Sequence, residues 1–171
     1  MKCPQNETMR KRVKFLAETN VDSPKWLSED VNIIDICETT ISSFSNQAIP
    51  SITSGNNIVS ILLTDDKKMS GLNKLYRNKA GPTNVLSFTN ENKHSNSKNI
   101  ILGDIALSFT TVLKESTQSK ISFINHVKHL LIHGCLHLIG FDHETAIEAQ
   151  EMEALEANIL RKLGVPNPYK I

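Results

Sequence analysis

The spacing of apolar residues predicts four strands. Residues 12–17, 57–63, 84–88 and 100–109 are short runs rich in apolar and β-branched side chains, which are typical of strands. The run at 57–63 is the most continuous of these and indicates a buried strand. Gly103 lies inside the last run, and an interior glycine predicts a bulge or a close approach of another backbone.

Helical spacing predicts the next two elements. A first helix opens at Pro24. Its apolar positions recur near the helical period, at Leu27, Val31, Ile34, Ile41 and Phe44. A second helix begins at Asp65 and Asp66, because carboxylates are favoured at a helix N-terminus, and Gly81 with Pro82 breaks it. Its apolar face carries Met69, Leu72 and Tyr76.

Two helices are predicted to close the chain, over residues 122–138 and 146–163. The second has clear boundary signals, because Thr145 and Glu148 form a capping box and Gly164 ends the helix. Its apolar stripe consists of Met152, Leu155, Ile159 and Leu163.

The order of these elements predicts the fold class. Residues 89–99 are almost entirely polar and predict a loop. We find no internal repeat and no linker composition, so residues 1–171 are expected to form a single domain. Strands interspersed with helices predict an α+β fold, with a small mixed sheet of about four strands surrounded by helices.

Composition and charge narrow the function classes. The chain has 171 residues, of which 39% are hydrophobic and 22% charged, so it is not a disordered chain. A net charge of +1 excludes a polycation, so any nucleic-acid contact must come from a local patch. Cys3, Cys37 and Cys135 are odd in number and far apart, which disfavours a disulfide scaffold and fits a reducing compartment. No signal peptide or membrane span is evident, so we expect a cytoplasmic protein with no membrane partner.

The informative segment is 125–143, which holds five of the six histidines. His133 and His137 are four residues apart on a predicted helix, which places their β-carbons about 5–6 Å apart on one face. Gly140 can turn the chain back, so that His143 is placed to supply a third ligand. Three imidazoles leave one tetrahedral position open, as catalytic zinc sites do. We therefore predict one Zn²⁺ per chain, although nickel, copper or iron could also fit.

Two histidines four residues apart would be weak evidence by themselves, and the third histidine with its glycine decides the interpretation. The spacing is also that of the metzincin proteases, in which a glutamate follows the first histidine as general base. Gly134 occupies that position here. Peptide hydrolysis by that mechanism is therefore disfavoured.

Other residues of this segment have two interpretations. His126 and His129 could line the approach to the metal or form a polar helix face. Asp142 could orient a histidine ligand or polarise the turn. Cys135 is interpreted as helix packing, because it points off the ligand face, and His94 as a solvated loop residue.

Four motifs together resemble the YbeY endoribonucleases. The segment HGCLHLIGFDH at 133–143 resembles the family signature, and LYRNK at 75–79 followed by PTNVLSF at 82–88 is similar to a second motif. LGDI at 102–105 resembles a third motif, and MEALE at 152–156 with the LG pair at 163–164 fits the last helix of the family. The similarity covers about residues 72–169, in family order.

The resemblance implies a cytoplasmic, zinc-dependent endoribonuclease with a zincin-like metal helix. It implies single-stranded RNA as substrate rather than DNA, and a role in maturation of the 3′ end of small-subunit rRNA and in ribosome quality control. Its partners would be rRNA and the ribosome or small-subunit proteins. The motifs carry the zinc-ligand role onto His133, His137 and His143, and a catalytic arginine onto Arg77.

A local basic cluster agrees with an RNA substrate. It consists of Lys67, Lys68, Lys74, Arg77 and Lys79, against Asp65 and Asp66. Phosphate contacts dominate nucleic-acid affinity, but without the resemblance the cluster would be interpreted as a solvated helix face. Two alternatives remain: a ribosome-associated assembly factor with a structural zinc, and a zinc hydrolase with a non-RNA substrate.

Overall fold

The computed structural model describes residues 13–28, 30–47, 49, 52, 54–92 and 98–170. Its strands are β1 (Val13–Val21), β2 (Gly55–Thr64), β3 (Val85–Thr89) and β4 (Asn99–Ser108). Its α-helices are α1 (Ile33–Ser42), α2 (Asp66–Arg77), α3 (Phe109–Gln118), α4 (Phe123–Leu138) and α5 (Ala146–Lys162). Two 3₁₀ helices flank α1, at Pro24–Trp26 and Ser43–Asn46.

The described strands form one mixed sheet, as the sequence predicted. The strand order is β1-β2-β4-β3. β1 pairs with β2 in parallel and β2 pairs with β4 in parallel, whereas β3 lies antiparallel to β4 at the edge. The α+β class with about four strands is therefore confirmed.

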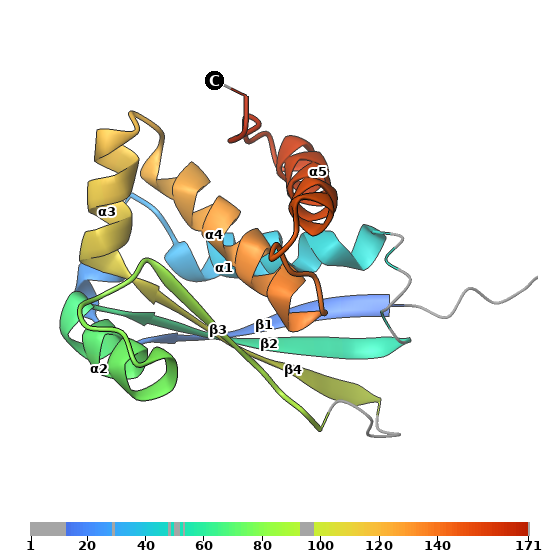
Figure 1. Cartoon of the computed structure of the whole chain (residues 1–171), viewed down its shortest axis with the longest axis horizontal. Helices are drawn as coiled ribbons and strands as arrows, with labels where there is room; N and C mark the ends of the chain where they lie inside the picture. Colours follow the sequence, from blue (N-terminus) through green and yellow to red (C-terminus); the bar gives the residue numbers. More distant parts are fainter. Residues whose placement is uncertain are drawn as a thin grey trace, which may run out of the picture.

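Successive residues of the inner strands face opposite layers of helices. Ile61 and Leu63 of β2 point into the main core with α1 and α4, while Leu62 between them packs on the other side. On that second side Met69 of α2 packs against Leu86 and Ala106 of the sheet. Figure 1 shows α1, α3 and α4 above the sheet and α2 at its lower left.

Helix α4 lies in the middle of the molecule, between the sheet and α5 (Figure 1). Ser122 caps its N-terminus by accepting a hydrogen bond from the backbone N–H of Asn125. Its buried residues are Val127, Leu130, Leu131, Ile132, Gly134, Cys135, Leu136 and Leu138. A helix buried on so much of its surface has few positions for polar side chains, so those that remain polar are confined to one narrow face.

The predicted continuous helix from Pro24 to Phe44 is wrong. A 3₁₀ turn ends at Trp26, and Leu27 adopts an extended conformation with 62% of its surface exposed. The side chain of Asn32 then caps a new helix by accepting hydrogen bonds from the backbone N–H groups of Ile34 and Asp35. Apolar residues on both sides of this break happened to continue the helical period, which concealed it.

Helix α3 was not predicted. Its sequence begins with Phe109 and the β-branched residues Thr110, Thr111 and Val112, which continue the strand pattern and have low helix propensity. Tertiary contacts favour the helix instead, because the carboxylate of Asp66 accepts hydrogen bonds from the hydroxyl and backbone N–H of Thr111.

The other predicted elements are confirmed with small shifts. β1 continues to Val21, beyond the predicted residue 17, and residue 12 lies outside the described residues. α2 ends at Arg77, because Asn78 adopts the left-handed conformation at φ 53° before Gly81 and Pro82 are reached. The predicted capping box of Thr145 and Glu148 is present. Among the described residues, no helix combines the length and apolar character that crossing a bilayer requires.

Both interpretations of Gly103 are confirmed. The β2–β4 register shifts here, so that Ile58 pairs with Ile101 but Val59 pairs with Gly103. Gly103 has φ +147°, and a β-carbon on it would lie 2.1 Å from the carbonyl oxygen of Phe88 and 2.9 Å from Leu138 of α4. Only glycine therefore fits where β3, β4 and α4 meet.

We expect Gly103→Ala to lower the free energy of unfolding by about 2–6 kcal/mol, because backbone strain and overpacking each cost roughly 1–3 kcal/mol. Gly71→Ala in α2 is the control, because a β-carbon there meets nothing within 4 Å, and alanine is favoured over glycine inside a helix by about 0.5–1 kcal/mol. Urea denaturation of both variants measures the difference. Equal stability of the two variants would contradict the close packing at Gly103.

Candidate metal centre

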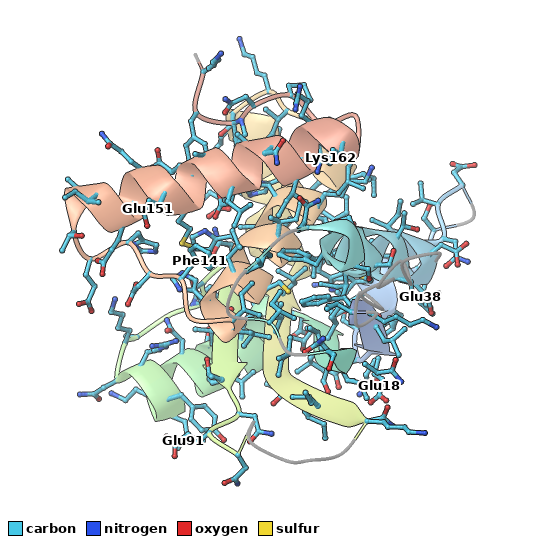
Figure 2. The ribbon with its side chains drawn as sticks, turned by 90° about the vertical axis from the view of Figure 1, so that its right-hand side faces the viewer. Glu18, Glu38, Glu91, Phe141, Glu151 and Lys162 are labelled. Carbon is cyan, nitrogen blue, oxygen red and sulfur yellow. The ribbon has the colours of Figure 1, made fainter. Side chains whose placement is uncertain are left out.

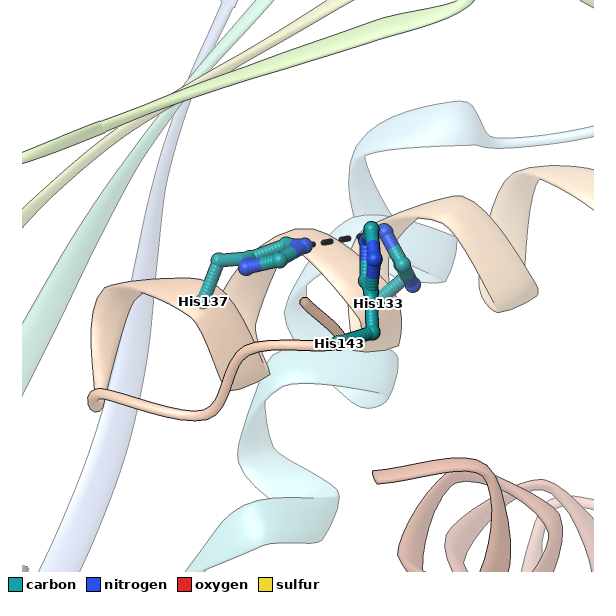
Figure 3. A group of neighbouring side chains, drawn as sticks. All are labelled: His133, His137 and His143. Carbon is teal, nitrogen blue, oxygen red and sulfur yellow. Dashed lines mark hydrogen bonds between the residues drawn. The ribbon is translucent and has the colours of Figure 1, made fainter. Parts of the chain in front are cut away.

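The three predicted histidines converge at the C-terminal end of α4. His133 and His137 lie one turn apart on its polar face, and Gly140, with φ +101°, turns the chain after the helix. The backbone N–H of Phe141 donates to the carbonyl of Leu136 at 3.0 Å, which closes the turn. His143 thereby returns beside the helix, as Figure 3 shows, and the three side chains bring one ligand atom each to within 4.8 Å of one another.

Hydrogen bonds from Nδ1 orient the two helical imidazoles. His133 Nδ1 lies 2.7 Å from a carboxylate oxygen of Glu156, and His137 Nδ1 lies 3.1 Å from the carbonyl oxygen of Phe141. Neither partner can donate a proton, because Glu156 is ionised and a carbonyl only accepts. In the neutral imidazole, each Nδ1 therefore carries the hydrogen and each Nε2 presents a lone pair.

The residues present fit a bound cation. The Nε2 atoms of His133 and His137 lie 3.1 Å apart, joined by the dashed line in Figure 3. Two lone pairs that face each other at this distance repel unless a proton or a metal ion lies between or beside them. The three-histidine group could therefore hold a metal ion, and an all-imidazole set suits zinc and other late transition metals.

Burial lowers the pKa of His137, and the neighbouring His133 and His143 lower it further by charge repulsion. The carboxylate of Asp142 and the Phe141 carbonyl act in the opposite direction without reversing the shift. A lowered pKa keeps the imidazole neutral at neutral pH, which is the form that binds a metal.

Glu156 of α5 is the supporting residue that sequence reasoning missed. Its side chain is fully buried. Burial raises the pKa of its carboxyl, but hydrogen bonds from His129, His133 and Tyr169 outweigh this and lower the pKa to about 2. A signal was present in the sequence, because Glu156 falls on the buried stripe of α5, four residues after Met152 and three before Ile159.

Arg77 lines the same cleft as the histidines. The cleft has a volume of about 650 Å³, and its lining includes Arg77, Lys79, His133, His137 and His143. Arg77 is the last residue of α2, and its Nη2 donates to the carbonyl oxygen of Ser87 at 3.1 Å. This bond holds the guanidinium at the edge of β3. The tertiary structure thus unites residues that are 56 positions apart in the chain, counted from 77 to 133.

The basic cluster divides in the structure. Arg77 and Lys79 line the cleft, whereas Lys68, at the other end of α2, forms an ion pair of 2.8 Å with Asp22. Asp65 caps α2 through the backbone N–H of Lys68. Lys67 and Lys74 are exposed and are not among the cleft residues.

His126 and His129 do not line the cleft. His126 Nε2 lies 2.8 Å from the carboxylate of Glu115, and His129 Nε2 lies 3.0 Å from that of Glu156. The interpretation as lining residues is therefore not supported, and both histidines belong to the polar face of α4, where they are partly buried partners of carboxylates.

Two of the remaining residues of the segment can be placed. The carboxylate of Asp142 accepts a hydrogen bond from the backbone N–H of His143 at 2.8 Å, which favours its interpretation as a turn residue. Cys135 is fully buried in the core, as its helix position predicted. His94 and Cys3 lie outside the described residues.

Gly134 packs against the sheet instead of facing the cleft. A β-carbon on it would lie 2.9 Å from Oγ of Ser87 and 3.1 Å from Cδ1 of Ile105. A glutamate at this position would be driven into β3 and β4, so a base in the position that metzincins use has no space. The absence of a protease glutamate thus has a packing reason.

Comparisons with known proteins agree with the sequence motifs. A family model described as Endoribonuclease YbeY matches residues 25–164. A protein of Bartonella quintana named Endoribonuclease YbeY is 39% identical over 153 residues, which cover 89% of this chain and 95% of that protein. One of Magnetococcus marinus with the same name is 44% identical over 120 residues, which cover 65% of this chain and 82% of that protein.

A solved structure shows a similar fold. The solution structure of TM1509 from Thermotoga maritima superimposes with a TM-score of 0.53 at 17% sequence identity. The match covers 93% of this chain and 99% of that one. At this identity the likeness concerns the fold alone.

We expect His137→Ala to lose bound metal after purification in zinc-containing buffer, whereas the wild-type protein retains about one ion per chain. Loss of a ligand should weaken binding by more than the roughly 10- to 100-fold that loss of a supporting outer residue costs. His126→Ala, on the same helix but bonded to Glu115, should retain the ion. Elemental analysis of the wild-type protein and of both variants checks this. A metal content in His137→Ala equal to that of the wild-type protein would contradict the site.

We also expect His137 to titrate below 6.5 in the metal-free protein, because burial and neighbouring imidazoles disfavour its charged form. It should therefore remain mostly neutral at pH 6.5 and take up a proton only as the pH falls further. A histidine-specific NMR titration measures this, and a midpoint at or above 6.5 would be inconsistent with the buried arrangement.

Proposed function

We propose a zinc-dependent endoribonuclease activity, specific for single-stranded RNA, for this chain, which belongs to the YbeY endoribonuclease family. The proposed process is rRNA maturation, at the 3′ end of the small-subunit rRNA, together with ribosome quality control. His133, His137 and His143 are the proposed zinc ligands, and Arg77 is the proposed catalytic residue.

The single observation that supports this proposal best is the composition of one cleft. A group able to hold a cation and the guanidinium of Arg77 line the same space of about 650 Å³. Positive charge placed where negative charge develops speeds phosphodiester cleavage, and this cleft offers such charge from two separate elements.

Arg77 would hold the scissile phosphate and offset its developing charge. One of its nitrogens donates to Ser87, and since a guanidinium has five N–H donors in a rigid fork, others are available to phosphate oxygens. Lys79 adds a second positive charge to the same lining. Zinc, when bound, would supply Lewis-acid polarisation of water or of a phosphate oxygen.

The positions of these residues reduce the number of candidate proton acceptors for the reaction. Gly134 offers no base, and His126 and His129 are outside the lining of the cleft. The sequence left three sources open: water acidified by zinc, a nearby histidine, and the RNA 2′-hydroxyl as nucleophile. The first and third are favoured, because neither His126 nor His129 lines the cleft.

The proposed partners are rRNA and the ribosome or small-subunit proteins, and the proposed location is the cytoplasm. The family name supports an RNA substrate. The alternatives of a structural zinc in an assembly factor and of a non-RNA substrate are outcomes of the test below.

We expect Arg77→Ala to lower kcat/KM for cleavage of a labelled single-stranded RNA by about 100- to 1000-fold, the usual effect of removing one donor to a transition state. Its zinc content should remain that of the wild-type protein, since Arg77 is on another element. Lys74→Ala is the matched control, because Lys74 is exposed on the same helix and outside the cleft lining. Chelator should abolish wild-type cleavage.

Unchanged cleavage by Arg77→Ala would contradict the role assigned to this residue. One zinc per chain without RNA cleavage would favour the assembly factor. Cleavage of a small phosphodiester but not of RNA would favour the alternative of a zinc hydrolase with a non-RNA substrate.

A further inference from the structure

The C-terminal segment folds back onto the side of the metal site that faces away from the cleft. α5 passes above the loop that carries Phe141, as Figure 2 shows, and ends at Lys162. Gly164, with φ +72°, turns the chain, and Val165 is buried in the core. The backbone N–H of Tyr169 donates to the side chain of Asn167 at 2.9 Å, which fixes a turn at the end of the segment.

This turn brings the Tyr169 hydroxyl to the Glu156 carboxylate. The hydroxyl donates to Oε2 of Glu156, and the Tyr169 ring packs edge-on against His129 with centroids 5.7 Å apart. His129 Nε2 lies 3.0 Å from the same carboxylate oxygen and 3.2 Å from the Tyr169 oxygen. Oε1 of Glu156 remains for His133 Nδ1, at 2.7 Å.

The two carboxylate oxygens of Glu156 therefore bind different partners. Oε2 accepts hydrogen bonds from Tyr169 and His129, and Oε1 accepts a hydrogen bond from Nδ1 of His133. Because the side chain of Glu156 is fully buried, solvent water cannot supply hydrogen bonds to its carboxylate. Its rotation, and with it the direction in which His133 Nε2 points, depends on the donors at Oε2.

We propose that Tyr169 is a positioning residue for the metal centre: through Glu156 it fixes the orientation of His133, so the C-terminal segment contributes to metal affinity. The inference rests on the proposed metal site. Among the described residues, Tyr169 is not in the lining of the cleft, and its side chain contacts Glu156 and His129, so its effect must pass through one of these two residues. Because 39% of the residue is exposed, contacts made at this surface would reach the metal site.

The test is a double-mutant cycle on zinc affinity, measured by competition with a chromophoric chelator. Glu156→Gln should weaken zinc binding by about 10- to 100-fold, as loss of an outer carboxylate does. Tyr169→Phe keeps the ring on His129 and removes only the hydroxyl, and should weaken binding by about 3- to 10-fold, less than loss of the carboxylate itself. In the Glu156→Gln background, Tyr169→Phe should have little further effect, because coupled residues are not additive.

Tyr76→Phe is the control, since Tyr76 is the other of the two tyrosines and lies on α2. It should leave zinc affinity unchanged. The thermal midpoint of each metal-free variant separates a loss of affinity from a loss of folding.

Wild-type affinity in Tyr169→Phe, or additive effects of the two substitutions, would overturn the inference and leave the proposed function intact. A wild-type protein that binds no zinc would overturn both. Zinc affinity that falls in Tyr169→Phe only together with the thermal midpoint would assign Tyr169 a structural role instead.

Discussion

The close packing of α4 between the sheet and α5 is the constraint on which the site depends. On one side Gly134 and Leu138 of α4 approach β3 and β4 so closely that Gly134 and Gly103 have no room for a side chain. On the other side the buried carboxylate of Glu156 in α5 accepts a hydrogen bond from His133. A helix fixed from both sides cannot rotate, so the face that carries His133 and His137 keeps its direction toward the cleft.

The same packing explains which chemistry the site can support. The position that metzincins use for a general base is filled by the sheet, whereas Arg77 of α2 lines the cleft together with the histidines. Nδ1 of both helical histidines is held by an acceptor, which leaves neutral imidazole nitrogens facing one another. The arrangement therefore favours a cation in the same cleft as an arginine, a combination that suits the proposed phosphodiester cleavage.

The network around Glu156 extends the site into parts of the chain that do not line the cleft. His129 and Tyr169 both hold the carboxylate that orients His133. His129, which the sequence suggested could line the approach to the metal, instead holds the carboxylate that supports a lining residue. Such support holds side chains in one rotamer, which is what a site needs when small displacements change affinity and rate.

The sequence by itself determined the elements whose signals are local: helix α4, helix α5 with its capping box, the buried strand β2, the glycine bulge in β4, and the spacing of the three histidines. It could not locate the break between Trp26 and Ile33, because apolar residues on both sides kept the helical period, or α3, because the contacts of Asp66 override a strand-like pattern. Only the tertiary structure decided that Arg77 shares a cleft with the histidines, and that Glu156 and Tyr169 lie behind His133. The physical reason is that helix pitch fixes neighbours three or four residues apart, whereas contacts between distant segments depend on how the helices pack on the sheet.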